Sequence, residues 1–224
     1  MKTLFLCRHA KSSWEYPELS DFERPLNARG HRDAEFMAKV LAQQRLRPDL
    51  MVASPAARAL TTARMIAAGI GYPLHDLMIT ERLYDASSGE ILQVAATLPE
   101  TVSVAMLFGH NPGMTLLANQ LGAPQIENIP TCGIVRLEST AEQWNQLAAA
   151  TTRFAAFEFP KNIWPDPSRF LPLLHQSTDA TFPAASVLWW IQGCVDPQFS
   201  LGLPPFASPA DILPQIFSQP MGRG

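Results

Sequence analysis

The stretch Thr3-Leu-Phe-Leu-Cys-Arg-His-Ala-Lys-Ser12 decides the fold of this chain. Its run of large apolar side chains predicts a buried strand, and the run stops at Arg8 and His9. Ligands of open α/β sheets bind at the carboxyl ends of strands. A guanidinium and an imidazole at such an end suit a phosphoryl group, because arginine offers a planar fork of donors and histidine can attack phosphorus. Alone, the pair also fits an incidental histidine at a solvated strand end.

Strands and helices alternate beyond this stretch. Short apolar runs predict further strands at residues 50–53, 76–80, 102–108 and 134–137, the last of them antiparallel. Apolar residues at helical spacing predict helices at residues 31–44, 55–68, 90–98, 114–121 and 141–150. Ser54 and Pro55 are expected to form the N-cap and first turn of the second helix. This order predicts an α/β class fold, a three-layer α/β/α arrangement with a mostly parallel sheet and helices on both faces.

Three strand ends carry residues that can bind phosphate. Right-handed connections place the loops after the first, second and fourth strands at one edge of the sheet. These loops carry Arg8 and His9, then Arg58, then His110. We therefore expect two arginines and two histidines to meet there. Phosphoryl transfer depends mainly on positioning and on neutralising the charge of the equatorial oxygens, which these side chains can supply without a metal or another cofactor.

Several motifs lie in order around these residues. Arg8-His-Ala10, Ser54-Pro-Ala-Ala-Arg-Ala59 with Thr61-Thr-Ala63, and Gly109-His-Asn-Pro-Gly113 resemble the motifs of the histidine phosphatase superfamily (branch 1, phosphoglycerate mutase-like). Within it the chain is most similar to the short phosphohistidine phosphatases of the SixA type. That similarity is carried by Lys11-Ser-Ser-Trp14, Arg24-Pro-Leu-Asn27, Arg29-Gly30, Pro130-Thr131 and Phe159-Pro-Lys161. The resemblance covers residues 1–162.

The resemblance implies a role for each matching residue. His9 would be the phosphorylated nucleophile, and Arg8, Arg58 and His110 would complete the phosphate pocket. The family's usual acid falls at Glu81, although the pattern around it is shortened. A phosphorylated imidazole is a good leaving group and needs less help from an acid than an alkoxide does.

Three residues near the pair are further candidates. Ser12 and Arg24 are expected to contact phosphate, and Lys11 is able to do so. The presence of Lys11 and Ser12 is explained equally well by their place in a polar loop, without a functional role. Arg24 is also explained as a surface arginine before a proline turn, or as a contact for a phosphoprotein.

Composition excludes several functional classes. The chain has 224 residues, a net charge of −3 and 17% charged residues, so it has no electrostatic footprint for nucleic acid or anionic membranes. Its three cysteines, Cys7, Cys132 and Cys194, have no metal-ligand spacing, which predicts no zinc site and a reducing compartment. With neither a signal peptide nor a membrane-spanning run apparent, we expect a cytoplasmic protein. The oligomeric state is not predicted.

The composition changes after residue 162. More than half of the 20 prolines lie from Pro160 onward, and charged residues become rare. We predict a histidine phosphatase domain at residues 1–162 and an irregular or partly disordered Pro-rich extension at residues 163–224. The aromatic residues of this extension argue against a purely solvated tail.

These patterns predict a metal-independent phosphatase with a phosphohistidine intermediate on His9. The preferred substrate is phosphohistidine on a signalling or phosphotransfer protein, because little chain lies between the motifs to close over a small ligand. The alternatives are a phosphatase of small phosphomonoesters and a non-catalytic phospho-binding module.

Overall fold

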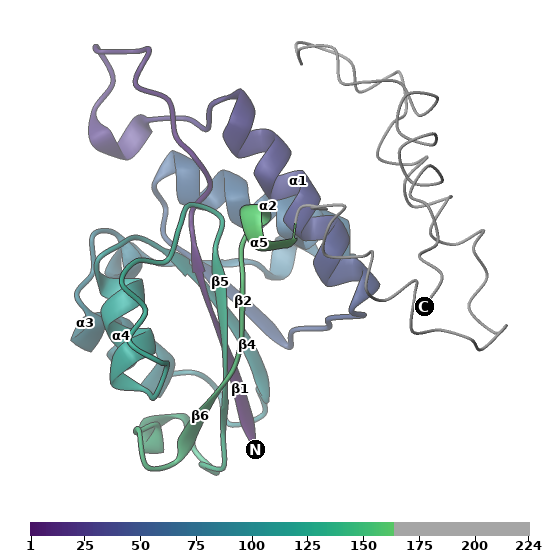
Figure 1. The fold of residues 1–224 in the computed structure, drawn as a ribbon, viewed down its shortest axis with the longest axis vertical. Helices are drawn as coiled ribbons and strands as arrows, with labels where there is room; N and C mark the ends of the chain where they lie inside the picture. The colour runs from purple at the N-terminus through teal and green to yellow at the C-terminus, as the bar shows by residue number, and fades with distance from the viewer. Residues whose placement is uncertain (164–224) are drawn as a thin grey trace, which may run out of the picture. The chain divides into compact units, whose positions relative to one another are not determined.

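The computed structural model describes residues 1–163, so the predicted extension at 163–224 lies almost entirely outside the described residues (Figure 1). A six-stranded sheet runs in the order β3-β2-β4-β1-β5-β6. Its strands are β1 (Lys2–Arg8), β2 (Leu50–Ala53), β3 (Met78–Ile79), β4 (Val104–Gly109), β5 (Ile134–Ser139) and β6 (Thr152–Glu158). Strands β1 to β4 are parallel to one another, β5 pairs antiparallel with β1, and β6 pairs antiparallel with β5. The predicted α/β class with a mostly parallel sheet is confirmed.

Helices cover both faces of the sheet (Figure 1). On one side lie α1 (Ala28–Gln43) and α2 (Ala57–Ile70), and on the other lie α3 (Ser88–Ala96) and α4 (Gly113–Gln120), while the short α5 (Pro160–Ile163) follows β6. Alternate residues of β1 serve the two layers, because successive side chains of a strand point to opposite faces. Leu4 and Leu6 join the apolar core under α3 and α4, whereas Phe5 and Cys7 join the core under α1 and α2.

The segment after β5 differs from the prediction. Residues 141–150 form no α-helix; they contain only a 3-10 turn, Trp144–Gln146, so the predicted helix is wrong. Trp144 is buried there and its indole Nε1 donates to the Val102 carbonyl at 2.9 Å. Anchoring this large side chain in the core sets the local backbone, which outweighs the helix propensity of the surrounding alanines. The strand β6 that follows was not predicted.

Register brings the ends of three strands level. Arg8 lies opposite Gly109 in the β1–β4 ladder, and the His9 amide donates to the Gly109 carbonyl at 3.1 Å. His9 and His110 therefore leave the sheet side by side. The Ser54 amide donates to the Phe108 carbonyl at 2.9 Å and brings the end of β2 to the same edge. No helix among residues 1–163 is long and apolar enough to cross a membrane.

Candidate active site

Three side chains from three strand ends meet at the carboxyl edge of the sheet. The rings of His9 and His110 lie 5.1 Å apart between centroids. Arg58, in the first turn of α2, joins them: its Nε lies 3.3 Å from His9 Nε2 and its Nη2 lies 3.3 Å from His110 Nδ1. All three side chains are buried. The structure thus forms one compact cluster around the Arg58 guanidinium.

Hydrogen bonding assigns the tautomer of His9. Its Nδ1 lies 2.7 Å from the Ala10 carbonyl oxygen, which can only accept, so Nδ1 carries the proton. The lone pair is then on Nε2, which faces Arg58. Burial is the main cause that lowers the pKa of His9 to about 3, and the charges of His110, Arg58 and Arg8 add to it against the opposing bond to Ala10. His9 is therefore neutral at pH 7, and the lone pair of its Nε2 accepts a hydrogen bond from Arg58 Nε.

His110 takes the opposite tautomer. Arginine can only donate, so Arg58 Nη2 donates to Nδ1 of His110, and Nε2–H of His110 donates to Ser54 Oγ at 2.9 Å. Burial, followed by the charge of Arg58, lowers the pKa of His110 to about 4, while Asp21 acts against this shift.

Ser54 does not cap α2 as predicted. The N-cap of α2 is Ala56, and Ser54 Oγ is engaged by the His110 ring, with only a long bond of 3.4 Å from the Ala56 amide. Ser54 follows β2 directly at the level where β4 ends, so its side chain faces the neighbouring strand end rather than the helix. Its role as a partner of His110 was missed, and no sequence signal beyond its place at a strand end points to it.

Arg8 forms another wall of the site. Its Nη1 donates to Asn128 Oδ1 at 3.2 Å and to the Ile129 carbonyl at 2.6 Å. The Asn111 side chain donates to the same two oxygens, at 2.7 and 3.0 Å. Arg8 Nε is buried and has no hydrogen-bond partner among the described residues. The Arg8 guanidinium is thus held through its Nη1, while its Nε–H donor remains unused.

An acidic residue that the sequence analysis did not single out lies at the exposed side of the cluster. Asp21 Oδ2 lies 2.8 Å from Arg58 Nη2, and the Asp21 carbonyl also accepts from Arg58 Nη1. Asp21 Oδ1 lies 2.9 Å from Arg24 Nη1, and the Tyr84 hydroxyl donates to Oδ2 at 3.1 Å. The available signal was its position three residues before Arg24, a spacing that suits an ion pair, but nothing local indicates the contact with Arg58.

Ser12 and Arg24 contact each other. Arg24 Nη2 donates to Ser12 Oγ at 2.7 Å and its Nε donates to the Ser13 carbonyl at 3.0 Å. The Arg24 guanidinium carbon lies 3.1 Å from the centroid of the exposed Trp14 ring. Both side chains are buried beside the cluster, and the bonds that they make organise the loop carrying Asp21. For the side chain of Lys11, the described structure gives no hydrogen bond or ion pair.

Glu81 lies apart from these contacts. It begins the 3-10 turn Glu81–Leu83 and its side chain is exposed. Within residues 1–163 it makes no hydrogen bond or ion pair with His9, His110 or either arginine. Among the acidic residues described, Asp21 is the one that contacts Arg58.

Metal ligands, cysteines and cavities were also the subject of predictions or lie elsewhere in the described residues. Residues 1–163 contain no group of three or more His, Cys, Asp or Glu side chains that could hold a metal ion. Cys7 and Cys132 are buried free thiols, and Cys194 lies outside the described residues.

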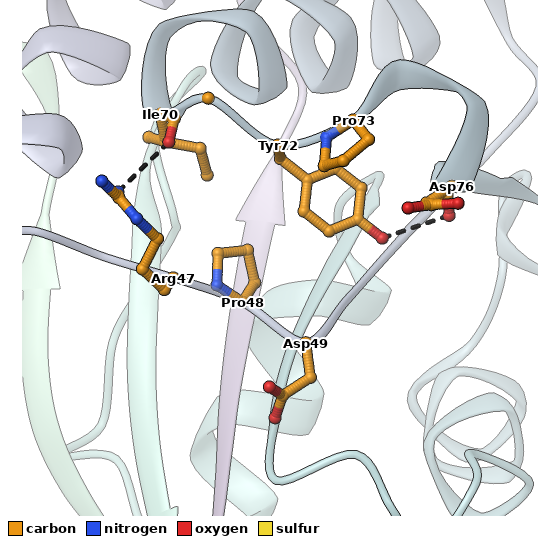
Figure 2. A pocket seen from close by; sticks show the side chains of 8 residues that line it. Arg47, Pro48, Asp49, Ile70, Tyr72, Pro73 and Asp76 are labelled. Atoms are coloured by element: carbon orange, nitrogen blue, oxygen red, sulfur yellow. Dashed lines mark hydrogen bonds between the residues drawn. The ribbon is translucent and has the colours of Figure 1, made fainter.

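A cavity of about 270 Å³ lies at the opposite, amino edge of the sheet (Figure 2). It is lined by residues such as Arg47, Asp49, Tyr72 and Asp76 and is remote from the histidine pair.

This fold and cluster define the class of the protein. The family model of the histidine phosphatase superfamily (branch 1) matches residues 4–105. An uncharacterized protein of Mycobacterium tuberculosis is 30% identical over 165 residues, which cover 69% of this chain and 99% of that protein. The chain belongs to the histidine phosphatase superfamily.

Solved structures are similar over the same part. A protein of Agrobacterium tumefaciens assigned as the phosphohistidine phosphatase SixA is 30% identical, with a TM-score of 0.59, covering 71% of this chain and 98% of that one. One from Nakamurella multipartitia with the same assignment is 25% identical, with a TM-score of 0.60 and coverage of 71% and 96%. The superfamily and these neighbours indicate a phosphatase, a hydrolase of phosphoryl groups.

Proposed function

We propose that this chain is a metal-independent phosphatase that forms a phosphohistidine intermediate on His9. Its preferred substrate is phosphohistidine carried by a signalling or phosphotransfer protein. The observation that carries the proposal is the state of His9: its Nδ1 is bonded to the Ala10 carbonyl and its Nε2 faces the Arg58 guanidinium. A neutral imidazole in this tautomer can attack phosphorus without first losing a proton.

In the first step, Nε2 of His9 forms a bond to phosphorus while the bond to the leaving group breaks. Arg8, Arg58 and His110 bind the phosphoryl oxygens, and their donors neutralise charge that spreads over those oxygens. The positive charge that develops on the His9 ring is stabilised by the 2.7 Å bond from Nδ1–H to the Ala10 carbonyl. A bound dianion beside His110 also raises the pKa of that imidazole, which favours its protonated, donating form.

In the second step, water attacks the phosphorus of phospho-His9. The P–N bond breaks, and the electron pair returns to Nε2, which restores the neutral ring. Phosphate leaves as H2PO4−, which carries the oxygen and both protons of that water. The two displacements replace one difficult hydrolysis by two easier steps.

The open mouth supports a protein-borne substrate. The Asp21 side chain is 52% exposed and Trp14 is 73% exposed, so the described residues leave the entrance uncovered. The similar structures from Agrobacterium tumefaciens and Nakamurella multipartitia carry phosphohistidine phosphatase in their assigned names. Small phosphomonoesters are the alternative substrates, and a phospho-binding module without turnover is the alternative function.

The test uses His9→Asn in the full chain. We expect turnover of a phosphohistidine peptide and of an aryl phosphate to fall by about a thousandfold or more, as the loss of a nucleophile does. Wild-type protein quenched during turnover should carry an acid-labile, base-stable phosphoryl group that His9→Asn lacks. His31→Asn is the matched control, because His31 is an exposed histidine at the start of α1.

Three outcomes would redirect the proposal. Equal turnover by His9→Asn and wild type would contradict the mechanism. Binding of the phosphopeptide by wild type without turnover would favour the non-catalytic module. Turnover of the aryl phosphate alone would favour small phosphomonoesters as substrates.

A further inference from the structure

Asp21 is held at the solvent side of the cluster by three different donors. Arg58 Nη2 and the Tyr84 hydroxyl both bond to Oδ2, while Arg24 Nη1 bonds to Oδ1. Tyr84 is itself fixed edge-on against the His110 ring, at 5.5 Å between centroids. A carboxylate with so many partners has a defined position even though half of its side-chain surface is exposed.

That position lies on the exposed side of the guanidinium that His9 also contacts. His9 Nε2 and Asp21 Oδ2 contact one and the same guanidinium, through Nε and Nη2 of Arg58 respectively. In phosphoryl transfer the attacking and leaving atoms are roughly in line, on opposite sides of phosphorus. His9 is buried and attacks from inside, so the leaving group faces the mouth, where Asp21 is exposed.

We propose that Asp21 makes the site selective for phosphohistidine over phosphate esters, by accepting a hydrogen bond from the free ring N–H of the substrate's phosphoimidazolium. This inference rests on the proposed function, of which it names the specificity-determining residue. It assigns to Asp21 a direct contact with the leaving group, which the sequence analysis had sought from Glu81.

The step balances without a transferred proton. The substrate ring carries the phosphoryl group on one nitrogen and a proton on the other. Nε2 of His9 forms the new P–N bond, the substrate's P–N bond breaks, and its electron pair returns to the substrate nitrogen. The imidazole leaves neutral and keeps its N–H, which Asp21 binds throughout, while the positive charge passes to the His9 ring.

The carboxylate has the capacity and the charge for this role. An ionised carboxylate has about four acceptor positions, and Oδ1 uses only one of its two, for Arg24. Burial alone would raise the pKa of Asp21, but the hydrogen bonds and charge of Arg58, with those from Arg24 and Tyr84, outweigh it and lower that pKa. Asp21 therefore stays ionised at pH 7.

An ester leaving group gains nothing from this residue. An alkoxide or phenolate develops negative charge as it departs and has no N–H to offer. A fixed carboxylate beside it is neutral or unfavourable. A site that hydrogen-bonds a substrate N–H discriminates against analogues that lack it, because selectivity is a difference between two affinities.

The experiment compares Asp21→Asn with wild type on two substrates, a phosphohistidine peptide and para-nitrophenyl phosphate. We expect kcat/KM for the phosphopeptide to fall about tenfold, the size of one lost hydrogen bond between charged groups. For para-nitrophenyl phosphate we expect a smaller fall, so the ratio of the two kcat/KM values, phosphopeptide over para-nitrophenyl phosphate, should decrease several-fold. For each variant, dividing kcat/KM for the phosphopeptide by kcat/KM for para-nitrophenyl phosphate cancels differences in the amount of folded protein.

Two further variants sharpen the comparison. Glu18→Gln removes an equal charge from an exposed residue of the same loop, and Glu18 makes no hydrogen bond in the described structure. The kcat/KM values of this variant for both substrates should therefore stay within about twofold of wild type. Asp21→Glu keeps the charge and should retain the preference for the phosphopeptide.

The outcomes separate this inference from the function on which it rests. If Asp21→Asn lowers both activities by the same factor, Asp21 only orients Arg58 and the inference is overturned while the phosphatase stands. If wild type fails to hydrolyse the phosphopeptide at all, the proposed substrate is wrong and the inference falls with it.

Discussion

The two edges of the sheet carry the same types of residue and use them differently. At the amino edge, Arg47 Nη1 donates to the Ile70 carbonyl at 3.2 Å, and the Tyr72 hydroxyl donates to the Asp76 carbonyl at 3.1 Å (Figure 2). The Asp49 carboxylate accepts the backbone amides of residues 103 and 104 at 2.8 and 2.9 Å. The partners are backbone groups, so these side chains fix the starts of strands and loops.

At the carboxyl edge an arginine, an aspartate and a tyrosine bond mainly to one another. Arg58 contacts Asp21, His9 and His110, and Tyr84 contacts Asp21. The difference lies in the two histidines, which register places side by side at the ends of β1 and β4. Residue type alone does not make a site; the meeting of side chains from several strand ends does.

The largest difference between the edges should appear when each loses its arginine. Arg58→Met removes the donors that face both histidine rings, and we expect kcat/KM for an aryl phosphate to fall about 100- to 1000-fold. Arg47→Met removes an exposed arginine that bonds to backbone carbonyls, and activity should stay within about twofold. Steady-state kinetics with circular dichroism as a folding check decides it. Similar losses of kcat/KM in Arg58→Met and Arg47→Met would show that the two edges do not differ in function.

A second difference is the dependence of stability on pH. The pKa values of His9 and His110, about 3 and about 4, lie below the ordinary value of 6.5. Between these limits the unfolded chain binds protons that the folded chain does not, so stability rises with pH and is lost as the pH falls below about 6.5. From pH 7 to pH 5, each histidine should remove about 2 kcal/mol from the free energy of unfolding.

Urea unfolding at both pH values checks this expectation. Between pH 7 and pH 5, the free energy of unfolding of His110→Asn should fall less than that of wild type. The difference should equal the contribution of the His110 imidazole, about 2 kcal/mol. His31→Asn, which alters an exposed histidine, should follow the wild-type curve. If His110→Asn shows the wild-type pH dependence, the imidazole does not titrate as inferred.

The smallest contrast is between the two tyrosines. Tyr72→Phe removes a hydroxyl that bonds to the Asp76 carbonyl and to the Met51 amide, so the free energy of unfolding should fall by about 1 kcal/mol with activity unchanged. Tyr84→Phe removes an exposed bond to Asp21, so it should cost less than about 0.5 kcal/mol and change kcat/KM a few-fold. A change in activity for Tyr72→Phe instead would link the two edges.

Much of the fold was predictable because its signals are local. Apolar runs marked β1, β2 and β4, and helical spacing marked α1, α2, α3 and α4 to within a few residues. The right-handed crossover rule then placed Arg8, His9, Arg58 and His110 at one edge before any distance was known. Each of these residues lies within a short stretch of a predicted strand end, so strand order was enough to bring them together.

The errors have the opposite origin. The turn at residues 144–146 follows from a tryptophan anchored in the core, and β6 is recognisable only through its pairing with β5. Ser54 reads as a helix cap from its neighbours in sequence, yet it bonds to a ring 56 residues away. The acid role of Glu81 stays a prediction; its side chain is exposed and makes no contact with the cluster among the described residues.

The order of amino acids is sufficient for the layered α/β class and for the four residues gathered at the carboxyl edge of the sheet, because strand ends and their register obey general rules. The arrangement of the mouth is not readable in that way. Asp21 lies in a polar loop without periodicity, and its contact with Arg58 spans 37 positions. The carboxylate of Asp21 therefore reaches Arg58 only when its loop is folded back onto α2, because long-range packing and not local propensity places it.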